Sequence, residues 1–143
     1  MDKNKSLMLD NQICFPLYAT SREIIKKYRP YLDEIGLTYT QYIAMLVFWE
    51  QKIINVKDLG ARLFLDSGTL TPVLKSLEKK GLVRRSRSRE DERVLLVEIT
   101  DEGMSLKELA KNIPCLLKEA LPITNEECAE LHRILYKLLD SKN

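Results

Sequence analysis

The chain has 143 residues, of which 45% are hydrophobic and 31% charged, and its formal net charge at pH 7 is +2. This composition fits one domain and argues against a disordered or fibrous protein. No apolar run approaches the roughly 18 to 20 residues of a membrane-spanning helix, and no secretory signal follows Met1, so we expect a cytoplasmic protein with no membrane segment.

The N-terminal segment predicts a first long helix. Apolar residues recur near helical spacing over residues 7–28. Pro16 fits a first turn but not a helix interior, so the regular helix starts near residues 13–15 or bends there. Pro30 and Gly36 then predict a short, separate helical turn between them.

A second and more apolar helix is predicted over residues 39–49. Thr38 and Gln41 form a capping-box pattern, in which Gln41 reaches back to the amide of Thr38. The nearly continuous apolar character of this helix indicates that it is buried on several sides.

Two further helices with a tight connection follow, over residues 56–65 and 67–80. Asp66 or Ser67 caps the second of them, which carries an inner apolar stripe. Gly81 ends this helix as a left-handed residue. Two helices joined in this way are what a helix-turn-helix requires.

An arginine-rich hairpin comes next. Residues 82–87 and 94–99 predict two strands, and residues 88–92 form their turn. Between Lys75 and Arg93 the sequence holds eight basic and four acidic residues. A basic patch on a near-neutral body indicates phosphate binding, although for the charge run alone a solvated charged face is the more usual explanation.

The helix over 67–80 and the hairpin together predict a DNA-binding surface. Short hydroxyl side chains let the helix enter a major groove, while its lysines contact phosphates. Asp91 orients Arg93 toward a narrow minor groove. For Ser67 and Thr69 by themselves, helix capping is the alternative interpretation. The predicted DNA contacts are Ser67, Thr69, Thr71, Pro72, Lys75, Ser76, Lys79, Arg85, Arg87, Arg89, Asp91 and Arg93.

The C-terminal part predicts more helices. Thr100 caps a helix over residues 101–112, and Pro114 and Pro122 punctuate the stretch after it. Thr124 then opens the last helix with a second capping box. Its apolar stripe exceeds what a small module buries, which predicts a two-fold homodimer.

The expected fold is mainly α with a small β wing (α+β). Residues 1–143 form one chain in which a winged helix-turn-helix module, residues 51–100, lies between dimerisation helices over 7–50 and 101–143.

Three cysteines stand far apart: Cys14, Cys115 and Cys128. Their odd number and spacing argue against a disulfide framework, and no Cys/His pattern indicates zinc. We therefore expect free thiols, no metal and no cofactor.

Several motifs resemble the MarR family of winged-helix repressors. They are the run from Leu59 to Arg85, then Asp91-Glu92-Arg93, and then Thr100-Asp101-Glu102-Gly103. The Asp-x-Arg wing followed by a strand and Thr-x-x-Gly is specific for that family, and the match covers essentially the whole chain. The resemblance implies a triangular homodimer on palindromic operators, with half-sites about 34 Å apart.

The motif Asn11-Gln12-Ile13-Cys14-Phe15 narrows the resemblance to the organic hydroperoxide resistance regulators, close to the staphylococcal thiol-based regulators. In that branch the cysteine of this motif reacts with peroxide. The resemblance implies that Tyr28 and Tyr39 hydrogen-bond its sulfur across the dimer, and that Phe15 and Trp49 favour organic peroxides. Pro16 departs from the branch, which usually has a small, helix-compatible residue there.

The proposed role of Cys14 also makes chemical sense. A thiolate attacks a peroxide, and both a helix N-terminus and tyrosine hydroxyls stabilise a thiolate. The alternative for this residue alone is a small buried core side chain. The oxidised sulfur then needs a second thiol. By resemblance this is Cys115 or Cys128 of the other subunit, or an external thiol, and we favour Cys115 because it is flanked by proline.

We therefore predict a transcriptional repressor, not an enzyme, that binds double-stranded operator DNA as a homodimer and releases it when organic hydroperoxide oxidises Cys14. One alternative is a MarR-type repressor that a phenolic or lipophilic ligand releases. A thiol peroxidase is a weaker alternative because the sequence offers no second catalytic base. A sequence-independent chromatin binder is weaker still.

Overall fold

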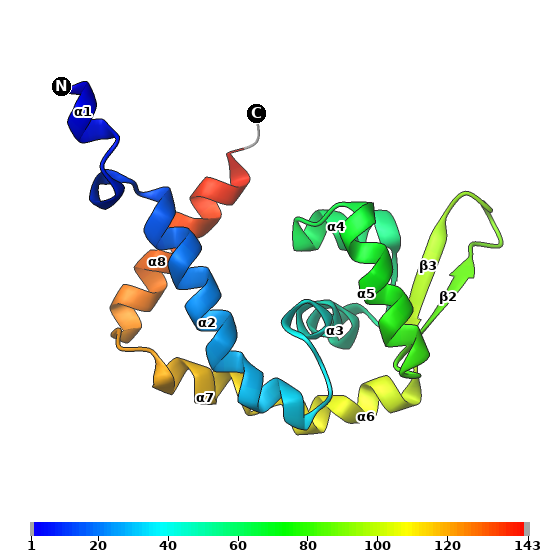
Figure 1. The fold of residues 1–143 in the computed structure, drawn as a ribbon. Coiled ribbons are helices and arrows are strands. Elements are labelled where there is room, and N and C mark those ends of the chain that lie inside the picture. Colours follow the sequence, from blue (N-terminus) through cyan, green and yellow to red (C-terminus); the bar gives the residue numbers. More distant parts are fainter. Residues whose placement is uncertain (1, 142–143) are drawn as a thin grey trace. The chain divides into compact units, whose positions relative to one another are not determined.

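The computed structural model describes residues 2–141 and is helical apart from one small sheet (Figure 1). The predicted fold class, mainly α with a small β wing, is confirmed. In chain order the elements are α1 (Lys3–Ser6), the 3-10 turn η1 (Leu9–Asn11), α2 (Cys14–Glu34), α3 (Tyr39–Gln51), β1 (Ile53–Asn55), α4 (Val56–Leu63), α5 (Ser67–Lys79), β2 (Val83–Arg87), β3 (Leu95–Ile99), α6 (Asp101–Ala110), α7 (Ile113–Ala120) and α8 (Asn125–Asp140).

The chain divides into two compact units, of which the first ends at Ile113 and the second begins at Pro114. The first unit holds α1 to α6 and the sheet. The second unit holds α8 and all of α7 except its first residue.

Helix α3 is the centre of the first unit. It contacts α2, α4, α5, α6 and the strands β1 and β3. Met45 and Phe48 are fully buried, and the predicted burial on several sides is confirmed. The apolar stripe of α5, formed by Leu70, Leu74 and Leu77, is buried in the same core.

Short polar side chains begin the helices at the predicted positions. Thr38 and Gln41 form the reciprocal capping box of α3, and the carboxylate of Asp66 accepts the amide of Thr69 at 2.7 Å. The Thr100 hydroxyl accepts the amide of Gly103 at the start of α6. These bonds fix where each helix starts because they satisfy amides that have no partner within the helix.

Helix α2 begins at Cys14, so Pro16 falls in its first turn as predicted. The prediction of a separate turn after Pro30 is wrong, because α2 continues through this proline to Glu34. The lost hydrogen bond and the clash of the proline ring with the preceding turn together cost about 3 kcal/mol. Two residues after this proline, Leu32 is 2% exposed in the core. Gly36, with φ of +69°, ends the helix.

The sheet has three antiparallel strands in the order β1-β3-β2. The predicted hairpin is β2 and β3, and β1 is an additional strand that was not predicted. Strand β1 has three residues, too few for an alternating pattern to show in sequence. Its central residue, Ile54, is buried opposite Val97 of β3. In Figure 1 the β2–β3 hairpin extends beyond α5 as a wing.

Gly103 joins α6 to the rest of the first unit. A Cβ atom at this position would lie 2.3 Å from the Leu82 carbonyl oxygen, so no other residue fits without displacement. The indole N–H of Trp49 donates to the Gly103 carbonyl at 2.9 Å. The Thr-x-x-Gly motif therefore allows close packing between α6 and the residue before β2.

The second unit contains a helix that the sequence analysis did not predict. Pro114 was interpreted as punctuation, yet it is the second residue of α7, where a helix needs no amide donor. Helix α8 begins at the predicted capping box of Thr124 and Glu127. Leu131 and Leu138 on its apolar stripe are 41% and 56% exposed.

Candidate nucleic-acid interface and thiol site

The outer face of α5 presents small polar and basic side chains. Because Asp66 provides the cap, Ser67 and Thr69 are not needed to cap the helix. The Thr71 hydroxyl is half-buried and donates to the Ser67 carbonyl at 2.7 Å. The predicted DNA contacts on this helix that are exposed are Ser67, Thr69, Pro72, Lys75 and Lys79.

Ser76 does not share this outer face. It is half-buried, and its hydroxyl accepts a hydrogen bond from the buried side chain of Gln41 at 2.8 Å. The prediction that Ser76 lies on the outward side of the helix is therefore corrected. The stripe of α5 that meets α3 also includes this serine.

Arg85 connects the wing to α5. Glu78 accepts the backbone amide of Arg85 at 2.8 Å and its guanidinium at 3.0 Å. These hydrogen bonds hold the pKa of the Glu78 carboxyl below its usual value, and the one from the Arg85 backbone amide contributes most. Arg85 thus fixes the wing against the helix, while Arg87 and Arg89 further along are exposed.

The tip of the wing holds the predicted pair of Asp91 and Arg93. The guanidinium donates to both carboxylate oxygens, at 3.1 and 3.2 Å, and the Arg93 amide donates to the same carboxylate. This lowers the pKa of Asp91, mainly through the side-chain bond. The Arg93 side chain is 91% exposed, so the pair orients a cation that remains open to a ligand.

Cys14 is the first residue of α2 and is exposed. The capping position, Ile13, offers no side-chain hydrogen bond, and the first turn has no acidic residue. The side chains of that turn therefore do not neutralise the positive end of the helix dipole, beside which the thiol lies.

Three tyrosines gather between α2 and α3. The rings of Tyr28 and Tyr39 lie 5.0 Å apart, and Tyr42 lies 5.7 Å from Tyr28. Burial, followed by the neighbouring Tyr39 and Tyr42, raises the pKa of Tyr28 to about 12. Burial likewise raises the pKa of Tyr39 and Tyr42. Near neutral pH these hydroxyls therefore keep their protons and can donate them in hydrogen bonds.

One protomer cannot bring Cys14 to this tyrosine cluster. Cys14 and Tyr28 both belong to α2 and are fourteen positions apart, which corresponds to about 21 Å along a helix. Any contact between this thiol and these hydroxyls therefore requires a second copy of the chain.

Two aromatic residues that the resemblance linked to the peroxide pocket lie in different surroundings. Phe15 is exposed beside Cys14 in the sequence. Trp49 is 8% exposed in the core, where its ring meets Tyr42 edge-on at 6.4 Å and its indole N–H is bonded to Gly103. Trp49 thus extends the tyrosine cluster inward.

The other two cysteines belong to the second unit. Cys115 is exposed in the first turn of α7 and its thiol lies 3.7 Å from the Glu119 carboxylate, to which it donates. Pro114 does not interrupt this helix. Cys128 is half-buried near the start of α8.

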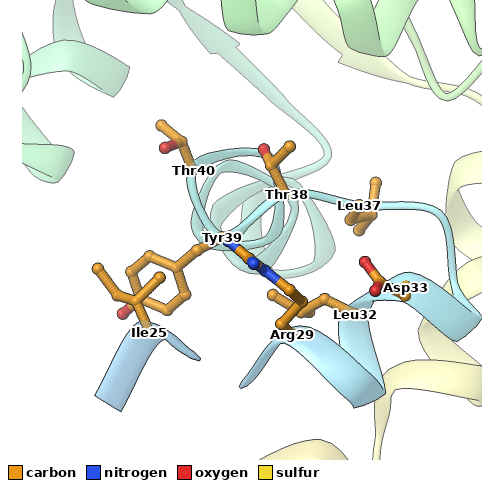
Figure 2. Close-up of a pocket in the computed structure, with 8 residues that line it drawn as sticks. All are labelled: Ile25, Arg29, Leu32, Asp33, Leu37, Thr38, Tyr39 and Thr40. Carbon is orange, nitrogen blue, oxygen red and sulfur yellow. The ribbon is translucent and has the colours of Figure 1, made fainter. Parts of the chain in front are cut away.

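A cavity of about 330 Å³ opens beside the tyrosine cluster (Figure 2). It is lined by residues from the second half of α2, the connecting turn and the start of α3. Arg29 and Asp33 bring charge to it, whereas Thr38 and Thr40 bring hydroxyls. The full lining is Ile25, Arg29, Leu32, Asp33, Leu37, Thr38, Tyr39 and Thr40.

Sequence reasoning did not identify Glu78, Lys80 or Gln41 as contributors to the interface. Lys80 was counted within the basic patch, but its ammonium donates to Gly36 and Gln41. The sequence does place opposite charges on α5 and β2, and this pattern could have predicted the Glu78–Arg85 ion pair. No sequence signal indicated that Gln41, a capping residue, also reaches α5.

Two kinds of feature are not found in the part of the chain that the structure describes. Among residues 2–141, no three side chains of His, Cys, Asp or Glu gather as a metal ion would require. No helix within the same residues is both long and apolar enough to cross a membrane.

Comparison with known proteins yields consistent similarities. The family model described as transcriptional regulator SarA/Rot matches residues 21–109. An organic hydroperoxide resistance transcriptional regulator of Bacillus subtilis (strain 168) is 46% identical over 140 residues, which cover 98% of this chain and 95% of that protein.

Two solved structures of AbfR, a protein of Staphylococcus epidermidis, are also similar. Reduced AbfR bound to DNA gives a TM-score of 0.83 at 33% identity, covering 99% of this chain and 96% of that one. Disulfide-formed AbfR gives a TM-score of 0.66 at 35% identity, covering 96% and 97% of the two chains.

Proposed function

Because this chain belongs to the SarA/Rot family of transcriptional regulators and is closely related to an organic hydroperoxide resistance regulator, we propose that it is a cytoplasmic, peroxide-responsive repressor. The members of this family are DNA-binding transcriptional regulators rather than enzymes. The proposal concerns the signal, the assembly and the residues that bind DNA.

The DNA-binding part of the proposal rests on α5 and the wing. In the homodimer, each α5 enters a major groove of a palindromic operator and each Arg93 enters the adjacent minor groove. Ser67, Thr69, Thr71 and Pro72 face bases, and the exposed cations contact phosphates. Those cations are Lys75, Lys79, Arg87 and Arg89. The guanidinium of Arg85 is committed to Glu78 and mainly positions the wing.

The observation that carries the sensing role is the separation of Cys14 from Tyr28 and Tyr39 within one protomer. An exposed thiol at a helix N-terminus and a set of protonated tyrosine hydroxyls are complementary. A second copy brings them together, so that Cys14 of one subunit meets the tyrosine cluster of the other. The exposed apolar stripe of α8 is a separate surface that a second copy of the chain can bury.

The chemistry needs one oxidant and one further thiol. The Cys14 thiolate attacks an organic hydroperoxide, the O–O bond breaks, an alcohol leaves and a sulfenic acid forms. A second thiol then attacks the sulfur, water leaves and a disulfide forms. We favour Cys115 of the partner subunit as that thiol because it is exposed, whereas Cys128 is half-buried. An external thiol could also react with the sulfenic acid.

The test compares wild-type protein with a Cys14→Ser variant. The probe is the palindromic duplex that reduced protein enriches from a random-sequence pool, and fluorescence anisotropy gives its affinity. One equivalent of cumene hydroperoxide is expected to weaken wild-type binding about 100-fold, within the usual range of allosteric coupling. The Cys14→Ser variant is expected not to respond, and a preserved response would refute the sensor assignment.

Intact-mass analysis and non-reducing electrophoresis identify the second thiol. A Cys115→Ser variant is expected to stop at the sulfenic acid without a cross-linked dimer, whereas Cys128→Ser still cross-links. The opposite pattern would assign the role to Cys128. If the oxidised wild-type protein forms no cross-linked dimer, an external thiol is favoured.

The cavity beside Tyr39 favours a second candidate function. Its volume of about 330 Å³ is at the small end of ligand sites. Its apolar wall and the Arg29 guanidinium suit a phenolic or lipophilic ligand that releases DNA without oxidation. Release by salicylate in the Cys14→Ser variant under reducing conditions would support this candidate and would count against a purely redox signal.

A further inference from the structure

Gln41 is the one buried polar side chain among the residues that the structure describes, with an exposed fraction of 6%. It is the third residue of α3 and belongs to the capping box that starts this helix. A capping residue at this position is ordinarily close to solvent, because the cap bond is made at the end of a helix. Its burial here means that another element covers it.

The covering element is α5. The Gln41 amide nitrogen donates to the Ser76 hydroxyl at 2.8 Å, and its oxygen accepts the Lys80 ammonium at 2.9 Å. The same oxygen accepts the Thr38 backbone amide at 3.0 Å. One side chain therefore binds the start of α3 and two successive turns of the helix that faces DNA.

Lys80 carries the connection to a third element. It is the residue that directly follows α5, and its ammonium also donates to the Gly36 carbonyl at 2.5 Å. Gly36 ends α2, so the end of α2, the start of α3 and the end of α5 meet at one set of hydrogen bonds. The network is partly buried, and at its centre is the buried Gln41 side chain, which would be left without partners if α5 moved away.

We infer that Gln41 is a positioning residue for DNA recognition: it fixes the direction of α5 relative to the α2–α3 junction through Ser76 and Lys80. The inference deepens the proposed function and rests on it for the role of α5. Gln41 itself reads no base, because it is buried on the side of α5 that faces α3.

Two residues of the tyrosine cluster lie in the same turn of α3 as Gln41. Tyr39 and Tyr42 are in the first turn of α3 with Gln41, and their rings contact Tyr28 of α2. A rearrangement of these rings on oxidation therefore acts on the turn that holds α5. Gln41 is placed to pass that change to the recognition helix.

The experiment uses three variants of the full-length protein, bound to the enriched palindrome and to a random duplex. Gln41→Met keeps the volume of the side chain but removes all three bonds. Gln41→Glu keeps an acceptor for Thr38 and Lys80, and the Ser76 hydroxyl can donate to it. Lys80→Met removes the partner, and Lys111→Met, an exposed lysine of α6's C-terminal end, controls for the loss of one charge.

In the reduced state, Gln41→Met is expected to weaken palindrome binding about tenfold while random-duplex binding is unchanged. Gln41→Glu is expected to restore affinity to within about twofold of wild type. The Gln41→Met/Lys80→Met double variant is expected to be no weaker than the weaker single variant, because both changes break one network. Gln41→Met leaves the salt dependence of binding unchanged, since no phosphate contact is lost.

Additive effects in the double variant, or equal losses on both duplexes, would overturn the inference and leave Gln41 a purely structural residue. Thermal midpoints confirm that each variant is folded. The measurements on reduced protein do not depend on the redox proposal. If wild type does not respond to peroxide, the proposed sensing function fails, but the binding data for the reduced variants still test whether Gln41 positions α5. If peroxide weakens DNA binding by the same factor in Gln41→Met as in wild type, Gln41 positions α5 but does not transmit the oxidation signal.

Discussion

The region around α5 and the wing and the thiol-bearing start of α2 are built in different ways. Around α5, contacts within one chain fix each element: Asp66 caps the helix, Glu78 holds the wing and Gln41 holds the other side. Around Cys14, the apolar side chains of Ile13 and Phe15 are exposed. The surroundings of α5 are complete within one chain, whereas the sensing site that we propose needs a second copy.

This difference teaches how a chemical signal can reach a rigid element. The tyrosine cluster belongs to both parts, because Tyr28 comes from α2 and Tyr39 from the same turn of α3 as Gln41. In the proposed dimer, the second subunit would therefore contact residues that are already linked to α5. The following expectations test the two halves separately.

The largest effect is expected at Gly103, within the part that one chain completes. In Gly103→Ala the new methyl group meets the Leu82 carbonyl at 2.3 Å and Ile99 at 2.6 Å. Such overpacking is expected to lower the free energy of unfolding by about 3 kcal/mol, measured by urea denaturation. Gly68→Ala is the control, because its nearest contact is 3.4 Å away. Equal stability of the two variants would show that α6 is not held at this joint.

A smaller effect on folding, but a large one on assembly, is expected at Leu138 of α8. This side chain is 56% exposed in the single chain. Burying the part of this leucine that is still exposed, once in each subunit, is worth about 2 kcal/mol in total, so Leu138→Asp should weaken dimerisation about 30-fold. Sedimentation equilibrium measures this, with Lys137→Asp as the neighbouring control outside the apolar stripe. A dimer that survives Leu138→Asp would place the subunit interface elsewhere.

The smallest effect is expected from the ionisation of Tyr28, which connects the two halves. Its pKa is raised from 10.0 to about 12, so folding favours the neutral hydroxyl. The resulting stabilisation is present below pH 10 and is lost as the pH rises toward 12. Between these values wild type should lose stability relative to Tyr28→Phe, as followed by thermal unfolding and tyrosinate absorbance. Parallel losses in both proteins would contradict burial of this hydroxyl.

Local signals in the sequence were sufficient to predict where α3, α5 and α6 start and where α5 ends. The caps at Thr38, Asp66 and Thr100, and the left-handed Gly81, depend on residues within a few positions of one another. The Asp91–Arg93 pair is equally local and was predicted correctly. The kinship with organic hydroperoxide resistance regulators, inferred from the motif around Cys14, is also confirmed.

Tertiary structure decided what depends on partners distant in the sequence. Pro30 was predicted to end a helix, but α2 continues through it to Leu32, which is buried in the core. Ser76 was predicted to face outward, but Gln41, 35 positions earlier, draws it inward. Caps, turns and periodicity are set by neighbours along the chain, and the sequence by itself therefore determined them. The direction of a side chain on a half-buried helix depends on which helix packs against it, and only the folded chain decided that.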